Sequence, residues 1–328
     1  MKKIAFVCVL LLLFSCKTET KKEVKEEKNT VETSTKAGIN IANLTSIHLG
    51  SGSVQRITEL PSAYIKTRPV DVWLPDGYSM EKAYAVLYMH DGQMLFDTAT
   101  TWNKQEWKVD EIAGQLQKNQ KTKDFIVVAV HNISEIRWND YFPAKAMDFV
   151  SEDDKAKITA LAHRNNANTD LYADNYLKFL VEELKPLIDS VYSVKSDAVN
   201  TSIAGSSMGG LVSMYAISEY PDIFGGAACI STHWPGAGVS DENPLPDAIF
   251  KYMEKNIPSP DTHRIYYDYG DQTLDQYYPQ YASRVDAIMK AKGYDVSNFE
   301  NRFFKGADHS ENSWNQRLDI PFMFLLGK

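Results

Sequence analysis

The sequence predicts an α/β protein whose central sheet is mostly parallel and is covered by helices on both faces. The first observation is a series of short, continuously apolar runs bounded by turn-forming residues, which is typical of strands buried on both faces. The second is a helical stripe between two of these runs, formed by Tyr176, Leu180, Leu184 and Leu187. The third is the motif Gly-Ser-Ser-Met-Gly at residues 205–209, which lies between an apolar run and a helix-like stretch. Such alternation is typical of helices on both sides of a parallel sheet.

The expected strands follow one another along most of the chain. Early strands, for which we consider an antiparallel orientation, are expected at residues 53–57 and 70–74. Central strands are expected at residues 85–89, 125–130, 201–204, 226–230 and 264–267. A last strand is expected at residues 301–304, followed by a short C-terminal helix at residues 314–326. Because open sheets of this class bind ligands at the carboxyl ends of their strands, site residues are expected just after strands.

The N-terminal segment has the features of a targeting signal rather than of a folded element. Lys2 and Lys3 precede an apolar run at residues 4–14, which is too short for a typical transmembrane helix. The run ends in Leu-Phe-Ser before Cys16, a pattern that resembles the signal box of bacterial lipoproteins. We therefore expect residues 1–15 to be removed as a signal peptide and Cys16 to carry lipid. A plain secretory signal is the alternative.

Composition divides the rest of the chain into a tether and one folded domain. Residues 16–39 contain the lipid site and a stretch rich in Lys, Glu and Thr that cannot bury enough apolar surface to fold. Residues 40–328 show no second linker or repeat and are expected to form one domain. The formal charge of −8 offers no basic surface for nucleic acid. The expected location is the bacterial cell envelope, on the periplasmic or outer face of the outer membrane, with membrane contact through the lipid anchor alone.

Ser207, at the centre of the glycine-flanked motif, is the candidate nucleophile. It follows the apolar run that ends at Ala204 and precedes the helix-like residues 211–220, which is the strand–turn–helix context of a nucleophile elbow. The small residues Gly205 and Gly209 suit the sharp, strained turn that an elbow requires. The start of a helix also places positive dipole near the oxyanion that forms on attack. This arrangement is typical of the α/β-hydrolase fold.

A serine hydroxyl needs a base, and in this fold the chain order is serine, acid, histidine. His309 is the expected base because it follows the last expected strand, whereas His263 precedes a strand. His233 is expected to line the same cleft and to contact substrate. The acid, which holds the tautomer of the imidazole, is expected in the loop after the preceding strand. Asp275 and Asp271 both qualify there, and we favour Asp275 while keeping Asp271 as the alternative.

The loop after an earlier strand is expected to supply the second oxyanion donor. Gly92 lets the backbone turn its N–H groups toward the acyl oxygen, so the amide of Gln93 or Gly92 would act together with that of Met208. His90 and Asp91 are expected either to contact substrate or to brace this loop. A metal site is not predicted, since no third ligand stands at a suitable spacing, and no cofactor is predicted.

Further segments between residues 68 and 314 carry the motifs of a known family. They are residues 68–75, 88–97, 107–111, the Ser207 elbow and residues 308–311. Together they resemble the "Putative esterase" family of α/β hydrolases, which includes esterase D, enterobactin esterases, and the feruloyl and acetylxylan esterases of carbohydrate esterase family one. The resemblance implies a serine esterase, and it places Arg137 and Tyr141 on a loop that borders the active cleft.

The expected activity is hydrolysis of carboxylic esters by a Ser-His-Asp triad. Acetyl or feruloyl esters of polysaccharides are the favoured substrates, and small siderophore esters come second. An acyltransferase with the same triad and a binding lipoprotein without catalysis are the competing hypotheses. Trp138, Tyr141 and Trp234 are expected either to stack on sugar or aryl rings at the cleft or to belong to the core.

Overall fold

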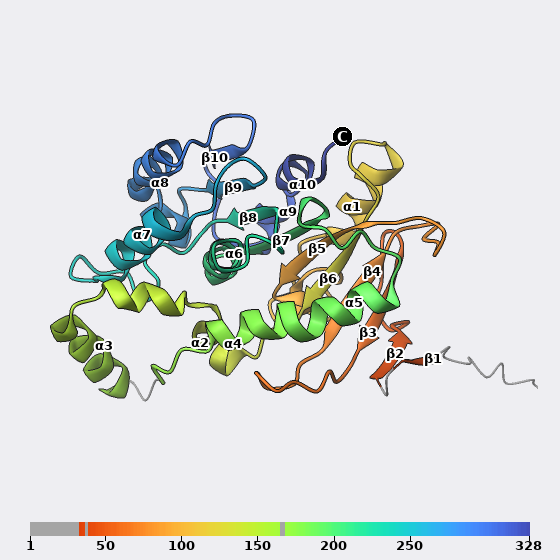
Figure 1. The fold of residues 1–328 in the computed structure, drawn as a ribbon, viewed down its shortest axis with the longest axis horizontal. Helices are drawn as coiled ribbons and strands as arrows, with labels where there is room; N and C mark the ends of the chain where they lie inside the picture. The colour runs from red at the N-terminus through yellow and green to blue at the C-terminus, as the bar shows by residue number, and fades with distance from the viewer. Residues whose placement is uncertain (1–32, 37–38, 165–167) are drawn as a thin grey trace, which may run out of the picture. The chain divides into compact units, whose positions relative to one another are not determined.

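A sheet of ten strands runs through the part of the chain that the computed structural model describes, residues 33–36, 39–164 and 168–328 (Figure 1). The strands are β1 (Thr33–Lys36), β2 (Ile39–Asn43), β3 (Ser53–Ile57), β4 (Val70–Leu74), β5 (Ala85–His90), β6 (Phe125–Val130), β7 (Thr201–Ser206), β8 (Gly226–Ile230), β9 (Arg264–Tyr269) and β10 (Phe299–Phe303). Their order across the sheet is β1-β2-β3-β4-β6-β5-β7-β8-β9-β10. All neighbouring pairs from β6 across to β10 are parallel, whereas β1 to β4 pair antiparallel with their neighbours. The mostly parallel sheet predicted from the sequence is confirmed.

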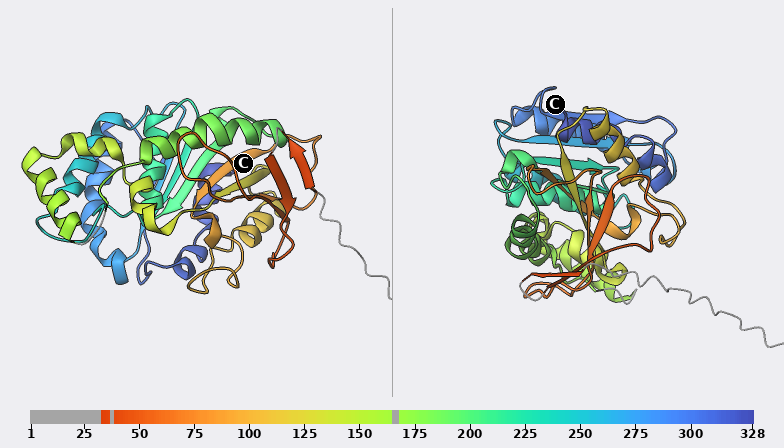
Figure 2. Two further views of the ribbon diagram at one scale, coloured as in Figure 1. Left: turned by 90° about the horizontal axis from the view of Figure 1, so that it is seen from below. Right: turned by 90° about the vertical axis from the view of Figure 1, so that its right-hand side faces the viewer.

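Helices cover both faces of this sheet (Figure 2). They are α1 (Val109–Lys118), α2 (Arg137–Tyr141), α3 (Glu152–Arg164), α4 (Ala173–Lys178), α5 (Lys185–Val191), α6 (Met208–Glu219), α7 (Leu245–Asn256), α8 (Pro279–Ala291), α9 (Glu311–Asn315) and α10 (Asp319–Leu326). Helices α1 and α10 pack together, while α6 and α7 contact each other elsewhere on the sheet. The strands between these layers are buried at every position of β4 to β8.

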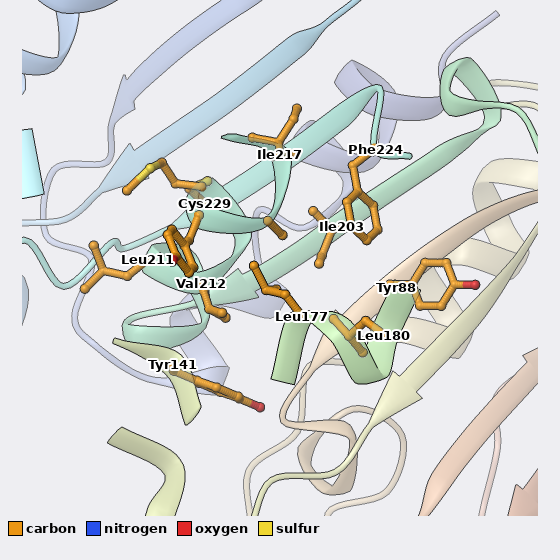
Figure 3. Close-up of a cluster of buried hydrophobic side chains, with 14 of the residues drawn as sticks. Tyr88, Tyr141, Leu177, Leu180, Ile203, Leu211, Val212, Ile217, Phe224 and Cys229 are labelled. Atoms are coloured by element: carbon orange, nitrogen blue, oxygen red, sulfur yellow. The ribbon is translucent and has the colours of Figure 1, made fainter. Parts of the chain in front are cut away.

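Alternation of side chains along the central strands divides the core into two clusters. On β5, Val86 and Tyr88 join one cluster, while Leu87 joins the other. The first cluster contains side chains of α4, α6, α7 and α8, and Figure 3 shows Leu177 and Ile203 among its members. The second contains side chains of α1, α9 and α10. Two apolar faces covered by helices explain why these strands are continuously apolar rather than alternating.

Two helical expectations differ in detail from the structure. The stripe from Tyr176 onward forms α4 and α5, joined by a wider π turn at Phe179–Leu184 that ends two residues before Pro186. Proline has no N–H to donate to the preceding turn, which accounts for the break in regular α-helix there. The single C-terminal helix expected at residues 314–326 is wrong, because α9 ends at Asn315 and α10 begins at Asp319.

The described residues from 33 onward belong to one compact unit. The signal peptide expected at residues 1–15, the lipidated Cys16 and most of the tether lie outside the described residues, so these remain predictions. Among the helices that the structure describes, none has both the length and the apolar character needed to span a bilayer.

Candidate active site

Ser207 occupies a sharp turn between β7 and α6. Its φ of 59° and ψ of −121° form a conformation that non-glycine residues rarely adopt. The turn depends on small neighbours: a Cβ added to Gly205 would lie 2.9 Å from the backbone of Gly209. One added to Gly210 would lie 2.8 Å from the hydroxyl oxygen of Thr232. The backbone thereby holds Ser207 partly exposed at the carboxyl end of a buried strand.

The structure brings His309 against Asp275. Their side chains meet through Nδ1 and Oδ1 at 2.6 Å, with the Asp275 side chain fully buried and the His309 side chain 14% exposed. Because a carboxylate only accepts hydrogen bonds, the proton of the neutral imidazole lies on Nδ1. Nε2 is therefore the acceptor, which is the state that a general base requires.

Asp271, the alternative acid, lies elsewhere in the same loop. Its Oδ1 accepts hydrogen bonds from the side-chain amide of Gln272 at 2.9 Å and from the backbone N–H of Gly306 at 2.8 Å. These two bonds lower the pKa of Asp271 from its ordinary value. Of the two aspartates, it is Asp275 that faces the imidazole, because the short helical turn at Thr273–Tyr277 directs its side chain inward. Asp271 instead links this loop to the loop before His309.

Two aromatic rings hold the imidazole in place. Trp314 and Tyr278 each pack edge-on against His309, with ring centroids 5.1 Å and 5.8 Å from that of the imidazole. Both rings are buried, at 5% and 1% exposure. The imidazole of His309, the candidate base, therefore has its orientation fixed by the Asp275 hydrogen bond and by its contacts with these rings.

Tyr278 also connects the candidate nucleophile to His233. Its hydroxyl lies 2.8 Å from Nδ1 of His233, whose Nε2 lies 2.8 Å from the carbonyl oxygen of Ala237. Burial lowers the pKa of His233 to about 4, so the ring is neutral near pH 7. A carbonyl only accepts, so the ring proton is on Nε2 and the Tyr278 hydroxyl donates to Nδ1. The phenol oxygen can then accept the hydrogen bond that joins it to the Ser207 side chain.

The loop expected to supply the oxyanion donor is a single turn at Gly92–Met94, directly after β5. A Cβ on Gly92 would lie 2.6 Å from the carbonyl oxygen of Ala129, so the turn can approach β6 this closely only with glycine. The Gln93 side chain accepts a hydrogen bond from the backbone N–H of Asn132 at 3.1 Å. These contacts fix the path of the backbone from Gly92 to Gln93.

Asp91 and Arg137 brace this turn through a paired contact. The Asp91 carboxylate accepts from Nε and one terminal nitrogen of Arg137 at 2.8 and 2.7 Å, and from the Asn132 amide at 2.6 Å. Burial alone would raise the pKa of Asp91, but the charge of Arg137 and the hydrogen bonds hold it below its ordinary value. Asp91, with φ of 58°, is therefore ionised and holds the start of the turn through its hydrogen bonds to Arg137 and Asn132.

His90 packs against the turn that carries Ser207. It is 2% exposed, and its Nδ1 lies 2.8 Å from the hydroxyl of Tyr176. A Cβ on Gly205 would lie 2.9 Å from a carbon of the His90 ring, so the ring packs directly against the nucleophile turn. Burial lowers the pKa of His90 to about 3. His90 is therefore a neutral packing residue in this structure.

Several residues expected at the cleft are buried or already bonded to other parts of the protein. Tyr141 is fully buried, and Trp234 is 4% exposed and stacks on Phe250 with ring centroids 4.8 Å apart. Trp138 is half-buried and donates from its indole to the carbonyl of Gly236. Both ring nitrogens of His233 already have protein partners. The stacking role considered for the three aromatics is replaced by core packing in Tyr141 and Trp234.

Sequence reasoning did not identify Tyr278 or Trp314. Tyr278 follows Asp275 by three residues within one helical turn, a spacing that puts both on neighbouring positions of the turn. Trp314 follows His309 by five residues. Spacing to an assigned acid or base is the one signal that would have indicated them.

This geometry agrees with the match to known proteins. The family model described as "Putative esterase" matches residues 62–324 of the chain. This chain belongs to that family. The esterase is therefore a carboxylic ester hydrolase. The part of the chain that matches includes the elbow, the Asp275 loop and the His309 segment.

Relatives of this esterase include enzymes named for ester hydrolysis. The endo-1,4-beta-xylanase/feruloyl esterase of Xylanibacter ruminicola is 24% identical over 282 residues, which cover 83% of this chain but 31% of that protein. A structure described as ferulic acid esterase has a TM-score of 0.60 at 20% identity, covering 85% of this chain and 98% of that chain. The enterobactin esterase of Shigella flexneri has a TM-score of 0.56 at 18% identity, covering 83% and 59%. These likenesses show that the esterase has the α/β-hydrolase fold.

The neutral state of buried His90 predicts an acid-dependent loss of stability in this esterase. Its folded pKa of about 3 lies below the ordinary value of 6.5, so between these values the unfolded chain binds a proton that the folded chain does not. This contribution is complete above pH 6.5 and is lost as the pH falls. From pH 7 to pH 5 it amounts to about 2 kcal/mol. Urea unfolding of the wild type and of His90→Gln should show the wild type losing more stability by that amount, and equal losses would contradict the assignment.

Proposed function

We propose that this esterase hydrolyses acetyl or feruloyl esters linked to carbohydrate, using Ser207 as nucleophile, His309 as base and Asp275 as the acid of the triad. The observation that carries this proposal is the strained Ser207 turn at the same sheet edge as an imidazole whose Nδ1 is held by a buried carboxylate. That arrangement leaves Nε2 as the acceptor for the serine proton.

The chemistry follows from the positions of these groups. The Ser207 hydroxyl turns from Tyr278 toward Nε2 of His309, gives up its proton there, and its oxygen forms a bond to the acyl carbon. The oxyanion receives hydrogen bonds from the backbone N–H of Met208 and of Gln93 or Gly92. The alcohol leaves with the proton from His309. Water then gives a proton to the same base and attacks the acyl carbon; the bond to the Ser207 oxygen breaks, the carboxylic acid leaves, and His309 returns the proton to Ser207. Asp275 stabilises the imidazolium in both halves.

Catalytic hydrogen bonds tighten as substrate binds, which accommodates a Ser207 hydroxyl that rests against Tyr278. One oxyanion donor is typically worth about 10²–10³-fold in rate. Met208 supplies such a donor from the first turn of α6, and the turn at Gly92–Met94 supplies the other. The Asp91–Arg137 pair and the Gly92 contact with β6 hold the second donor in place before substrate arrives.

Carbohydrate-linked substrates are supported by two observations. The relative from Xylanibacter ruminicola is named both a xylanase and a feruloyl esterase, so its two named activities concern xylan and feruloyl esters. In this chain, Trp102 is 83% exposed. The neighbouring Asn103 donates to Glu311 at 2.8 Å, two residues beyond His309, and so ties the tryptophan loop to the base segment. An exposed indole on a tethered loop suits stacking on a sugar ring. Siderophore esters are the second candidate class, because the fold is shared with an enterobactin esterase.

Ser207→Ala should abolish turnover and covalent labelling. Without the hydroxyl no acyl-enzyme can form, and kcat for p-nitrophenyl acetate is expected to fall on the order of 10⁴-fold or more. Mass spectrometry after reaction with a fluorophosphonate should find an adduct on Ser207 in the wild type and none in the variant. Retained hydrolysis together with an adduct at another residue would disprove the assignment. Absence of any adduct in the wild type would favour a binding protein.

The two aspartates of one loop form a matched pair for testing the acid. Asp275→Asn removes the acceptor that fixes the His309 tautomer, and kcat should fall by a factor on the order of 10⁴. Asp271→Asn removes the charge from a partly exposed carboxylate that bonds to the Gly306 N–H and does not contact His309, so kcat should change little. Steady-state kinetics with p-nitrophenyl acetate measure both. A larger loss in the Asp271 variant would exchange the assignments.

Trp102→Ala tests the carbohydrate side of the proposal. Loss of a stacked sugar should raise KM for a feruloylated arabinoxylan oligosaccharide by about 2- to 12-fold. Turnover of methyl ferulate, which has no sugar, should stay unchanged. Met80→Ala is the control, since Met80 is 64% exposed and lies before β5, at the opposite end of the strands. Equal effects on both substrates would remove Trp102 from the binding site.

A further inference from the structure

Ser231, the first residue after β8, places a buried hydroxyl against the proposed triad acid. Its Oγ lies 2.7 Å from Oδ2 of Asp275, which is the carboxylate oxygen that does not face His309. The same Oγ lies 2.9 Å from a terminal nitrogen of Arg317 and 3.0 Å from the indole nitrogen of Trp314. Ser231 and Asp275 are fully buried, and the other two are at most 5% exposed.

The direction of each hydrogen bond at Ser231 is fixed by the chemistry of its partners. A carboxylate can only accept, whereas a guanidinium and an indole N–H can only donate. A serine hydroxyl has one proton and two lone pairs. The hydroxyl of Ser231 therefore donates to Asp275 and accepts from both Arg317 and Trp314. Its hydrogen-bonding capacity is full, so no alternative arrangement of these four groups satisfies all of them.

A buried ion pair anchors this hydroxyl from the other side. Arg317 donates to both carboxylate oxygens of Asp268, at 3.1 and 2.9 Å. Oδ1 of Asp268 also accepts the backbone N–H of Ser231 at 2.9 Å. Burial alone would lower the pKa of Arg317, but the charge of Asp268 raises it, so the guanidinium remains charged. The backbone and the side chain of Ser231 are thus both held by one ion pair.

The hydroxyl reaches both the acid and the base of the site. It donates to Oδ2 of Asp275, which also accepts the backbone N–H of Gly270 at 2.6 Å. The other oxygen, Oδ1, faces His309. It accepts from Trp314, whose ring packs edge-on against His309. One oxygen atom therefore sets the position of the carboxylate and of one ring that orients the imidazole.

We propose that Ser231 is a positioning residue for the triad, which holds Asp275 through a hydroxyl polarised by Arg317. This inference rests on the proposed function, since it assigns Ser231 a role through Asp275 and His309. The hydrogen bond from Ser231 stabilises negative charge on Oδ2. Without it, more charge falls on Oδ1, the imidazolium of His309 becomes more stable, and a higher pH is needed to free the base.

The test compares Ser231→Ala and Ser231→Gly with the wild type. Ser231 has φ of 40°, a conformation that glycine adopts without strain, so the glycine variant removes the hydroxyl while relieving the backbone. Ser218→Ala is the matched control, because the Ser218 hydroxyl bonds the carbonyl of Met214 at the far end of α6. Each variant is assayed with p-nitrophenyl acetate across pH 5 to 9, and its folding is checked by thermal unfolding.

Both Ser231 variants should lose about 10- to 100-fold in kcat with KM little changed, the range set by loss of one charge-assisted hydrogen bond. The acidic limb of kcat/KM should move to higher pH in both, whereas the control should match the wild type. A structural role would lower the amount of active enzyme without moving that limb. Ser231 variants with wild-type kcat and an unmoved limb would overturn the inference, provided that Ser207→Ala is inactive. If Ser207→Ala is active, the proposed function itself fails. Should the alanine variant fail to fold, the glycine variant decides.

Discussion

The site depends on the register of the parallel strands β7 to β10, which places their carboxyl ends side by side. Ala204 of β7 stands opposite Ala228 of β8, which stands opposite Tyr266 of β9, and that residue stands opposite Glu300 of β10. Strands aligned in this way end at one edge of the sheet, so the loops after them emerge side by side. The elbow, Ser231, Asp275 and His309 all lie on those loops. The proposed nucleophile, acid and base, which are far apart in the chain, lie at one edge of the sheet for this reason.

Two ion pairs, one fully buried and one partly exposed at Arg137, fix the two sides of that edge. Asp91 with Arg137 holds the turn expected to supply an oxyanion donor, and Asp268 with Arg317 lies beneath the acid. Buried pairs of this kind contribute little net stability because desolvation offsets their attraction. Their effect here is on position, since each one holds a loop at two or more hydrogen-bonding atoms. Removal of one partner from the Asp268–Arg317 pair would leave an uncompensated buried charge, which typically costs about 3–5 kcal/mol.

The sequence was sufficient where a role depends on local pattern. Continuous apolar runs predicted the central strands, and the glycine spacing around Ser207 predicted the elbow that its φ and ψ now show. The choice between Asp275 and Asp271 could not be made from position, because both follow the same strand and a single helical turn decides which one faces inward. Ser231 gave no signal, since its role arises from Arg317, 86 residues later in the chain. For Tyr141 and Trp234 the sequence left stacking and core packing open, because an aromatic near a site looks alike in sequence whether it is buried or exposed.

Three histidines near the elbow have the same side chain but different surroundings, and the surroundings determine which of them can accept a proton. His90 and His233 bond to tyrosine hydroxyls and lie in buried positions that lower their pKa values to about 3 and about 4. Each stays neutral, and the groups that bond to their ring nitrogens, two tyrosine hydroxyls and a backbone carbonyl, are uncharged. His309 alone among these three is bonded to a carboxylate. In the proposed mechanism, only His309 would carry the proton from Ser207 next to a carboxylate, so the position of Asp275 selects which of the three histidines acts as the base.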